Sequence, residues 1–367
     1  MKMYIGVDVH SKHTVYVAQG DNGDVVGQGK VVTTAEGFSR MLDALRAPEG
    51  TEIGLETGTQ AAWVSRLLSG LNMKPLVIDA REVRQKARRI GQKCDRRDAF
   101  DICDGLRRGI YSSIVYVPTP EVLRLRRILS RRRHFVRLCT GQISAAKSLL
   151  RWVGLQGEAA SLTTEAAWEK LLRGGGVELL RELLAMHAEV WGAAEENTTK
   201  LDKELPEALK PFQETINLLR TMPGVGLITS ATFVAVLGTP ERFPDSGRVA
   251  SYIGLVPSTW DTGETIRHGH ITKRGSSELR AMLCECAQHA ARKSHPLNPY
   301  FARICATFGY KRAVIAMALR LARILFAMWR KGEKFDVKKL NLVAQRRTVT
   351  KTYHWRIRRR EEQPVVA

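Results

Sequence analysis

Four carboxylates stand where acidic side chains could do phosphoryl-transfer chemistry. Asp8 lies inside a short hydrophobic strand-like segment, and Glu56 ends another. A carboxylate in such a setting is costly to bury unless a cation meets it. Asp95 and Asp98 are three residues apart in an expected helix, so they share one face. Carboxylate oxygens are the ligands of Mg²⁺ or Mn²⁺, and two such ions can stabilise the attacking and leaving oxygens of a phosphodiester.

Each acid also has an ordinary structural explanation. A lone Asp is commonly a helix cap or a surface charge, and the helix dipole favours Asp95 at the start of a helix. Asp101 and Asp104 continue the same spacing of three, so this helix could simply be acidic. Spacing alone therefore leaves a metal site and an acidic helix as alternatives.

Strands and helices in a particular order are expected to position these acids. Strand-like segments cover residues 3–9, 14–19, 25–32, 52–56 and 75–79, and helical patterns cover 35–47, 59–70, 81–91 and 95–108. Three meander strands followed by alternating strands and helices indicate an α/β domain with a mixed sheet, over residues 1–118. That order is typical of the ribonuclease-H-like arrangement.

The rest of the chain is strongly basic. The 367 residues contain 58 Lys and Arg against 37 Asp and Glu, a net charge of +21, and nearly all of the excess follows residue 119. A balanced portion with a cluster of acids, joined to a basic remainder, suits a protein that grips a polyanion and acts on it. The alternative is a generally basic soluble protein.

Two long charged helical stretches, about 119–153 and 177–217, flank a break that contains Ser, Thr and Gly. They predict an antiparallel coiled coil or helical hairpin over residues 119–217. The first stretch holds seven arginines between positions 124 and 137. The candidates for nucleic-acid contact are Arg124, Arg126, Arg127, Arg131, Arg132 and Arg133.

A mainly helical domain is expected over residues 218–340. Its turn Pro223-Gly224-Val225-Gly226 resembles a helix-hairpin-helix element, in which Gly224 and Gly226 let backbone N–H groups approach phosphates; a plain interhelical turn is the alternative. Loop or strand is expected over 251–275, and helices over about 276–293, 297–307 and 310–331. The basic tail, 341–367, is expected to order on nucleic acid.

Other classes of protein are disfavoured. The six cysteines lack paired CxxC spacing, so structural thiols in a reducing cytosol are expected, with zinc as the weaker alternative. The apolar stretches are far shorter than the roughly 18–20 residues of a membrane span, and no signal pattern opens the chain. We expect a soluble cytoplasmic protein with no membrane partner.

Several motifs together resemble one family. GVDVH, LETG and KCDRRDA, in this order and at these spacings, resemble the DEDD-type insertion-sequence transposases, whose relatives include bridge-RNA-guided recombinases. PGVGLITSATFVAVLG, FPDSGRVASYIGLVP and HITKRGSSELRAML resemble the second conserved domain of that family. The likeness covers roughly residues 3–335. It implies that Asp8, Glu56, Asp95 and Asp98 are the metal-binding acids of a RuvC-like domain.

The resemblance also implies partners and a nucleophile. Donor and target DNA are the implied substrates, and a structured guide RNA is an implied partner, in a prokaryotic, nucleoid-associated setting. The family combines its acids with a serine that precedes a glycine shortly after a Gly-Leu-x-Pro segment. Here that position holds Thr262, before Gly263. Threonine keeps the hydroxyl, but its methyl group crowds the attack.

Three alternatives follow for the nucleophile: Thr262 is a natural variant, this copy is impaired, or Ser258 has taken over. Thr262 could also be only a turn residue. Nearby basic residues are candidates for positioning phosphates, with a solvated basic loop as the alternative. They are Arg267, His268, His270, Lys273 and Arg274. The two histidines lack companions at metal-ligand spacing.

Three functions compete. The first is a transposase or recombinase with a covalent protein–DNA intermediate, and the second is a RuvC-like nuclease or junction resolvase without one. The third is a non-catalytic nucleic-acid-binding protein. If the acids and Thr262 lie in separate domains, a composite site could form across subunits, which would make the chain a homodimer or tetramer.

Overall fold

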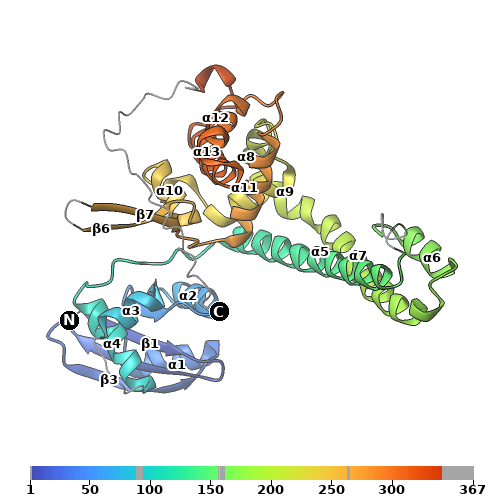
Figure 1. Ribbon diagram of the computed structural model, residues 1–367. Helices are drawn as coiled ribbons and strands as arrows, with labels where there is room; N and C mark the ends of the chain where they lie inside the picture. Colours follow the sequence, from blue (N-terminus) through green and yellow to red (C-terminus); the bar gives the residue numbers. More distant parts are fainter. Residues whose placement is uncertain (1, 88–93, 156, 158–161, 263–264, 341–367) are drawn as a thin grey trace, which may run out of the picture. The chain divides into compact units, whose positions relative to one another are not determined.

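The computed structural model describes residues 2–87, 94–155, 157, 162–262 and 265–340, with the backbone alone at 260–262 and 265–268. These residues form two compact units, Met1–Leu123 and Arg124–Ala367. The first is a mixed α/β unit and the second is mostly helical (Figure 1). The predicted combination of classes is therefore confirmed. The division into four domains stays a prediction, and the tail at 341–367 lies outside the described residues.

A five-stranded mixed sheet forms the centre of the first unit. Its strands are β1 (Met3–Val9), β2 (His13–Gly20), β3 (Val25–Val32), β4 (Glu52–Glu56) and β5 (Lys74–Ile78). They lie in the order β3-β2-β1-β4-β5. The first three strands pair antiparallel, whereas β1, β4 and β5 run parallel to one another. The sequence predicted each strand to within one residue at either end.

Helices cover both faces of this sheet. α1 (Ala35–Leu45) and α2 (Ala61–Gly70) share a core with Ile5 and the other β1 side chains on one face. α4 (Asp95–Arg107) shares a second core with Tyr4 on the other face. Because successive side chains of a strand point to opposite sides, β1 contributes to both cores. It is therefore the central strand that carries Asp8.

The segment that follows α4 is fastened to α3 (Ala80–Lys86) by one buried acid. The Glu82 carboxylate accepts hydrogen bonds from the backbone N–H groups of Ser112 and Ser113, at 3.0 and 2.7 Å, and pairs with the Lys86 ammonium at 2.6 Å. The hydrogen bond from Lys86, followed by those from the backbone, lowers the pKa of Glu82 well below its usual value. The acid is therefore a structural clamp.

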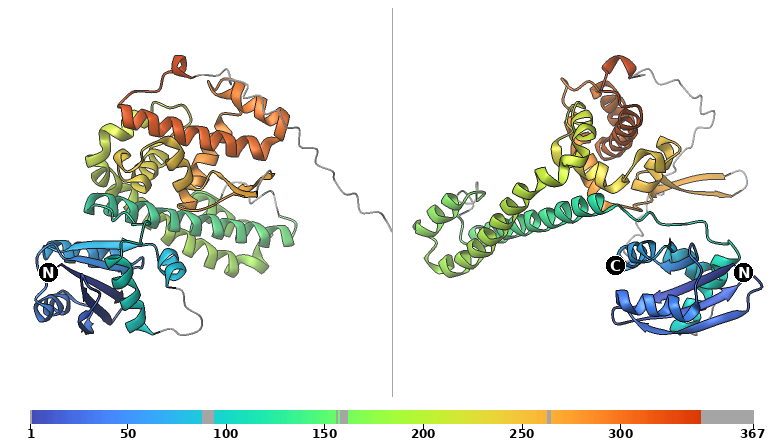
Figure 2. Two further views of the ribbon diagram at one scale, coloured as in Figure 1. Left: turned by 90° about the vertical axis from the view of Figure 1, so that its left-hand side faces the viewer. Right: turned by 180° about the vertical axis from the view of Figure 1, so that it is seen from behind.

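Two long helices run antiparallel in the second unit. α5 (Pro120–Trp152) and α7 (Arg181–Leu209) lie side by side in every view (Figures 1 and 2). The thiol of Cys139 donates to the carbonyl of Trp191 at 3.8 Å, and both side chains belong to one buried core. The two long helices predicted from the sequence are present, but the second is shorter than the predicted stretch of about 177–217, because η1 (Glu178–Leu180) precedes it and it ends at Leu209.

The predicted break between these helices is wrong in one respect, because it contains a further helix, α6 (Glu165–Arg173). The hydroxyl of Thr164 accepts a hydrogen bond from the backbone N–H of Ala167, which caps the start of α6. Trp168 and Leu171 are buried against α5 and α7. Tertiary packing therefore selects a helix in a segment whose Thr and Gly content suggested a loop.

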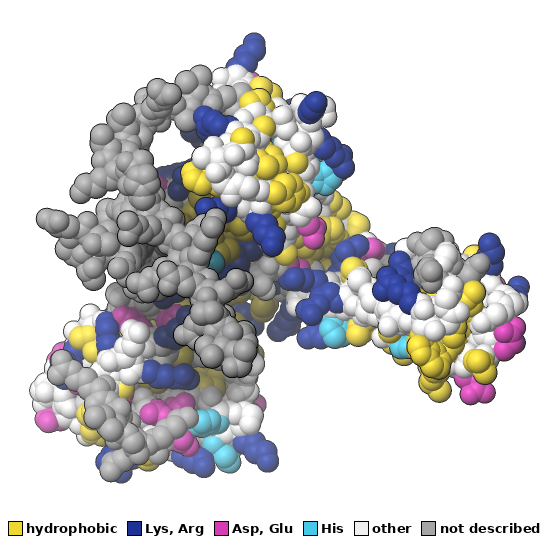
Figure 3. Space-filling model, in the orientation of Figure 1, with side chains coloured by type: hydrophobic (Ala, Val, Ile, Leu, Met, Phe, Trp, Pro, Cys, Tyr) yellow, Lys and Arg dark blue, Asp and Glu magenta, His cyan; other side chains and the backbone are white. Residues whose placement is uncertain are grey.

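One face of α7 leaves apolar side chains exposed. Leu183, Met186 and Val190 are 46%, 62% and 46% exposed, and Leu179 in the preceding turn η1 (Glu178–Leu180) is 88% exposed. Their spacing of four, three and four residues places them on one side of the helix. Yellow side chains gather over the region of α6 and α7 in Figure 3. Contiguous exposed apolar residues are typical of a protein–protein interface.

A helical bundle and one hairpin complete the second unit. Its elements are η2 (Lys210–Phe212), α8 (Gln213–Leu219), α9 (Leu227–Leu237), η3 (Pro240–Arg242), α10 (Ser246–Ile253), β6 (Pro257–Thr262), β7 (Thr265–Ile271), α11 (Ser277–His289), α12 (Asn298–Phe308), α13 (Tyr310–Lys331) and η4 (Val337–Lys339). α9 and α13 are central to its core. Across the described ranges, every helix is too short or too polar to cross a bilayer.

Candidate active site

The register of two parallel strands puts Asp8 beside Glu56. β1 pairs with β4 through Val7 and Leu55, so the next residue of each strand stands at the same edge of the sheet. Both acids are intermediate in exposure, and the Asp8 side chain is 18% exposed. The carboxyl ends of adjacent parallel strands are a common location for catalytic groups.

The first turn of α4 brings Asp95 and Asp98 to the same region. α4 crosses β1 at Gly6, where an added Cβ would lie 2.2 Å from the carbonyl oxygen of Ala99 and 2.4 Å from the backbone nitrogen of Cys103. The thiol of Cys103 donates to the carbonyl of Tyr4 at 3.2 Å. The helix therefore rests directly on the strand two residues before Asp8.

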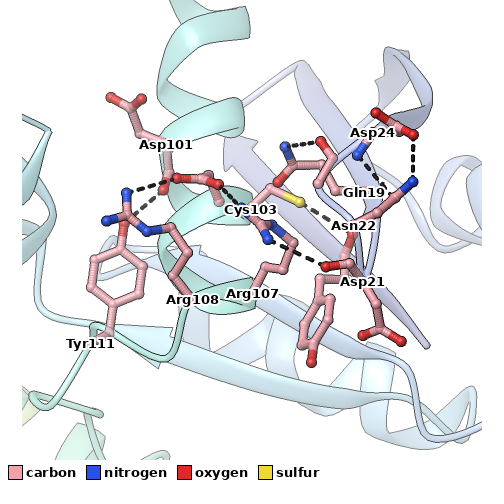
Figure 4. A network of polar contacts seen from close by, with 12 residues as sticks. Gln19, Asp21, Asn22, Asp24, Asp101, Cys103, Arg107, Arg108 and Tyr111 are labelled. Atoms are coloured by element: carbon pink, nitrogen blue, oxygen red, sulfur yellow. Dashed lines mark hydrogen bonds and ion pairs between the residues drawn. The ribbon is translucent and has the colours of Figure 1, made fainter.

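The opposite end of α4 is held by a separate polar network (Figure 4). The Arg107 guanidinium binds the carboxylate of Asp104 at 2.6 Å and donates to the carbonyl of Asp21 at 3.3 Å, in the turn between β2 and β3. The hydroxyl of Tyr111 donates to the carbonyl of Asp101 at 2.8 Å. Asp104 thus has a structural task, and the helix is more than an acidic surface.

Within the described residues, three possible metal ligands lie close together, and one of them is a histidine that the sequence did not indicate as a ligand. His10 Nε2 lies 3.1 Å from a carboxylate oxygen of Asp8 and 3.4 Å from one of Asp95. One ligand atom from each of the three residues lies within 4.8 Å of the others. Asp8 and His10 are two apart in extended chain, so they point the same way. That alternation was the available sequence signal.

The remaining acids act on this cluster through their charge. Burial raises the pKa of Asp8 above its usual value, the His10 imidazole opposes that shift, and the charges of Asp98 and Asp95 add to it. Asp98 therefore lies close enough to Asp8 to influence its ionisation. Glu56 and Asp98 are not part of this group of three, and both make interactions of their own.

This donor set fits a divalent cation. A half-buried carboxylate whose pKa is raised by burial and by neighbouring acids, as that of Asp8 is, is stabilised when a cation binds, because the cation offsets both effects. Carboxylate oxygens suit Mg²⁺ and Mn²⁺, whereas an imidazole nitrogen suits Mn²⁺ better than Mg²⁺. Asp8, His10 and Asp95 could hold such an ion, with Glu56 and Asp98 beside them.

Thr262 ends the first strand of a two-stranded sheet in the second unit. Its backbone pairs with Thr265 across a two-residue connection, so it stands at the tip of the β6–β7 hairpin. Gly263 lies outside the described residues, as do the side chains of Thr262, Arg267 and His268. Ser258 lies near the base instead, where its hydroxyl donates to the carbonyl of His270 at 2.9 Å.

The loop after this hairpin is packed tightly. Gly254 ends α10 with a φ of +78°, and a Cβ there would lie 2.2 Å from the carbonyl oxygen of Arg274. The Arg280 guanidinium donates to the carbonyls of Arg274 and Gly275 at 2.6 and 3.2 Å. Lys273 and Arg274 are exposed on this fixed loop. Their side chains are therefore available to a partner.

The arginines of α5 divide into two groups. Arg126 donates to the carbonyls of Ala235 and Val236 at the end of α9, at 2.5 and 3.0 Å. Arg132 binds both carboxylate oxygens of Asp202, and Arg133 lies 3.5 Å from a carboxylate oxygen of Glu278. These three side chains stabilise the fold. The exposed candidates are Arg124, Arg127 and Arg131, at a spacing of three and four residues.

The turn at 223–226 joins α8 to α9 as predicted. Gly224 has a φ of +79°, and Gly226 precedes the first residue of α9 without a side-chain cap. Both glycines are exposed. The imidazole Nε2 of His295 lies 3.1 Å from the carbonyl oxygen of Pro223, and this contact holds the turn. Binding of phosphate at this turn stays a prediction.

Comparison with known proteins gives the chain a family. A family model described as a transposase, of the DEDD IS110 type, matches residues 5–153, which include all four acids. A second model, the transposase IS116/IS110/IS902 family, matches residues 216–302, which include Thr262. Together they cover more than half of the chain. The chain belongs to this family of insertion-sequence DNA transposases.

Individual relatives agree with that assignment. The protein y4qE of Sinorhizobium fredii, whose name assigns it provisionally to the transposases, is 26% identical over 306 residues, 77% of this chain and 70% of the relative. The transposase for insertion sequence element IS1111A of Coxiella burnetii is 24% identical over 278 residues, 74% of this chain and 75% of the relative. The pilin gene-inverting protein of Moraxella lacunata is 28% identical over 147 residues, 38% of this chain and 46% of the relative.

Proposed function

We propose that this transposase cuts and rejoins DNA at a metal-dependent site formed by Asp8, Glu56, Asp95 and Asp98, with Thr262 as the attacking hydroxyl. The observation that carries the proposal is the convergence of β1, β4 and the first turn of α4, which supply these acids from three elements. An acidic surface helix would not need β1 to contribute a half-buried carboxylate.

The fold of the first unit supports a RuvC-like assignment. Three antiparallel strands are followed by two parallel ones in the order β3-β2-β1-β4-β5. The acids stand on the central strand, on its parallel neighbour and on a helix that crosses the sheet. This arrangement is compatible with the RuvC-like fold that the resemblance to the DEDD family implies.

The protein side chains have distinct tasks in the proposed reaction. A bound Mg²⁺ or Mn²⁺ would supply positive charge to the phosphate oxygens as the reaction proceeds. The carboxylates of Asp8 and Asp95 would bind and orient the cation, and Glu56 and Asp98 would add negative charge beside them. His10 Nε2, at 3.1 and 3.4 Å from carboxylate oxygens of Asp8 and Asp95, would share the cation with these two acids.

The strand transfer has two balanced steps. The Thr262 hydroxyl loses its proton and its oxygen bonds to phosphorus, while the bond between phosphorus and O3′ breaks and the released O3′ takes a proton. A 3′-hydroxyl from another strand then loses its proton and its oxygen bonds to the same phosphorus, while the bond between phosphorus and the Thr262 oxygen breaks and Thr262 takes a proton. Each step exchanges one phosphodiester for another, so no nucleotide cofactor is consumed. Inversion of a DNA segment, in the name of the Moraxella relative, fits such an exchange.

Charge and exposure suggest how nucleic acid is held. Arg124, Arg127 and Arg131 are exposed along one side of α5 and would neutralise successive phosphates. Donor and target DNA are the proposed substrates, and a structured guide RNA is the proposed partner in the bacterial cytoplasm. Co-purified nucleic acid that survives deoxyribonuclease but not ribonuclease, and carries one recurring sequence, is the expected result. Purification with DNA alone would reject the guide RNA.

The exposed apolar residues of α7 support a homodimer or tetramer. Asp8 and Thr262 lie in different compact units, so one copy can contribute its acids while another contributes its hydroxyl. Mixing Asp8→Asn chains with Thr262→Ala chains is expected to restore strand exchange. Absence of rescue would place the complete site in one chain.

Trapping of the covalent intermediate tests the nucleophile. Thr262→Ala is expected to abolish the protein–DNA adduct, Thr262→Ser to retain or increase it, and Ser258→Ala, the matched hydroxyl control, to leave it unchanged. Asp8→Asn is expected to abolish strand cleavage. Cleavage that persists in Thr262→Ala, with no adduct in the parent protein, would favour a RuvC-like nuclease or junction resolvase. Unchanged strand exchange in Asp8→Asn would reject the acidic site.

A further inference from the structure

A positively charged pocket lies in the second unit between α12, α13 and the segment that ends at Leu340. Its volume is about 330 Å³, near the lower limit for small-molecule sites. Most of its lining is aliphatic and comes from α13. Among the described residues that line it, none is acidic. Its polar lining consists of Tyr300, Arg320, Arg323 and Lys339.

A flat aromatic and cationic pair forms one wall. The Arg320 guanidinium lies 4.4 Å from the centre of the Tyr300 ring. Arg303, which does not line the pocket, lies 5.5 Å from the same ring and restrains it further. Aromatic rings and guanidinium planes are the surfaces on which unpaired bases stack. The aliphatic side chains of the lining provide no hydrogen-bonding groups that would favour water.

The surrounding charge favours an anion. Residues 292–340 contain 12 Lys or Arg against two acids. Glu333 pairs with Lys339 at 2.7 Å, so Lys339 is partly neutralised and serves to fix the wall. Arg323 is exposed, and within the described residues its guanidinium has no carboxylate within 4 Å. A phosphate could therefore pair with Arg323 without displacing an acid.

These features together select the ligand. An acidic peptide would satisfy Arg323 but would leave the flat wall without a stacking partner. The chain's own tail, 341–367, carries seven Lys or Arg against two Glu, so Arg320 and Arg323 repel it. We propose that this pocket binds one unpaired nucleotide of a single-stranded nucleic acid, with the base on the Tyr300–Arg320 pair and the phosphate at Arg323.

The inference rests on the proposed function only in that both require nucleic acid. Binding is therefore measured on the full chain without divalent metal, so that its failure is independent of strand exchange. A ten-nucleotide oligouridine with one 4-thiouridine is irradiated with the protein, and the crosslinked peptide is identified by mass spectrometry. We expect the crosslink in the peptide that contains Tyr300, and none with the corresponding duplex. An oligothymidine with 4-thiothymidine tests whether a deoxyribonucleotide enters as well.

Fluorescence anisotropy with the same oligonucleotides gives the energetic test. Tyr300→Leu is expected to weaken binding about tenfold, the loss of about one stacked base, whereas Tyr300→Phe keeps the ring and is expected to bind normally. Arg323→Gln is expected to reduce the slope of log affinity against log salt by about 0.7, the loss of one phosphate contact. Lys311→Gln removes the same charge from an exposed position outside the pocket and is expected to keep the crosslink.

Several results would overturn the proposal. One is a crosslink that maps to other peptides only, and another is equal crosslinking of the duplex. Unchanged affinity in a Tyr300→Leu protein would exclude stacking on this ring. If the Tyr300→Leu protein fails to fold, the comparison of Arg323→Gln with Lys311→Gln still tests the pocket. Identical effects of these two substitutions on affinity and on its salt dependence would show that binding depends only on general positive charge.

Discussion

Gly6→Ala should separate the acids of the active site without altering any of them. A Cβ at position 6 would lie 2.2 Å from the carbonyl oxygen of Ala99 and 2.4 Å from the nitrogen of Cys103. Both are backbone atoms of α4, so no side-chain rotation relieves the overlap. Ordinary contacts of a Cβ begin near 3.4 Å. α4 must therefore move away from β1 by about 1 Å.

That displacement has two calculable costs. Overpacking of a well-filled contact costs about 1–3 kcal/mol of unfolding free energy, to which the hydrogen bond from Cys103 to Tyr4 contributes when it lengthens. Asp95 moves with the helix while Asp8 stays with the strand. A displacement of about 1 Å in a catalytic arrangement reduces the rate on the order of 100-fold.

Urea unfolding and DNA cleavage measure the two costs on the same protein. Gly70→Ala is the matched control, because nothing lies within 4 Å of a Cβ added there. We expect Gly70→Ala to behave as the parent protein, and Gly6→Ala to lose both stability and cleavage. Unchanged cleavage in a destabilised Gly6→Ala protein would show that the position of α4 does not control the site. Unchanged stability would contradict the packing argument itself.

Three further predictions follow from other contacts. Because the folded-state pKa of Glu82 is lowered, its contribution to stability is present above the unfolded pKa of about 4.3 and is lost as pH falls through the folded value. Glu82→Gln should therefore lower the unfolding free energy by about 2 kcal/mol at pH 7. It should also flatten the acid limb of a plot of unfolding free energy against pH. His10→Ala should weaken Mn²⁺ binding about tenfold, measured by electron paramagnetic resonance, with little effect on the affinity for competing Mg²⁺. His13 is exposed, and His13→Ala should leave the affinities for both ions unchanged. Equal losses of affinity for the two ions in His10→Ala would exclude His10 as a ligand. If the exposed face of α7 joins two copies of the chain, Leu183→Glu should lower the molar mass measured by light scattering. Glu182→Ala is the control and should leave the mass unchanged. The same mass for both variants would exclude that face as the interface between copies.

The sequence predicted the first unit well because its signals are local. β1, β3 and β4 begin and end at the predicted residues, and α4 ends one residue early. Short strands rich in β-branched residues, separated by Asn and Gly, leave few alternative registers. The four acids became candidates for the same reason, since Asp8 and Glu56 lie in such strands and Asp95 and Asp98 lie in the first turn of a helix that the local pattern predicts.

Other features required tertiary information. His10 meets Asp95, which is 85 residues later in the chain, and no spacing rule connects them. Arg126 and Arg127 are adjacent in sequence, yet one binds the end of α9 and the other is exposed. α6 exists because Trp168 is buried by its neighbours. Each of these outcomes depends on packing partners that are remote in sequence.

The parallel pairing of β1 and β4 has a consequence for how the length of this chain can vary. Asp8 and Glu56 are level because Val7 is level with Leu55. One residue inserted or deleted within either strand turns every later side chain of that strand to the opposite face. Insertions in the turn at 21–24 or the loop at 46–51 leave this pairing untouched. Among functional proteins of this transposase family, insertions and deletions in the first unit should therefore occur in those loops. Both strands should keep a constant number of residues even where their apolar side chains differ.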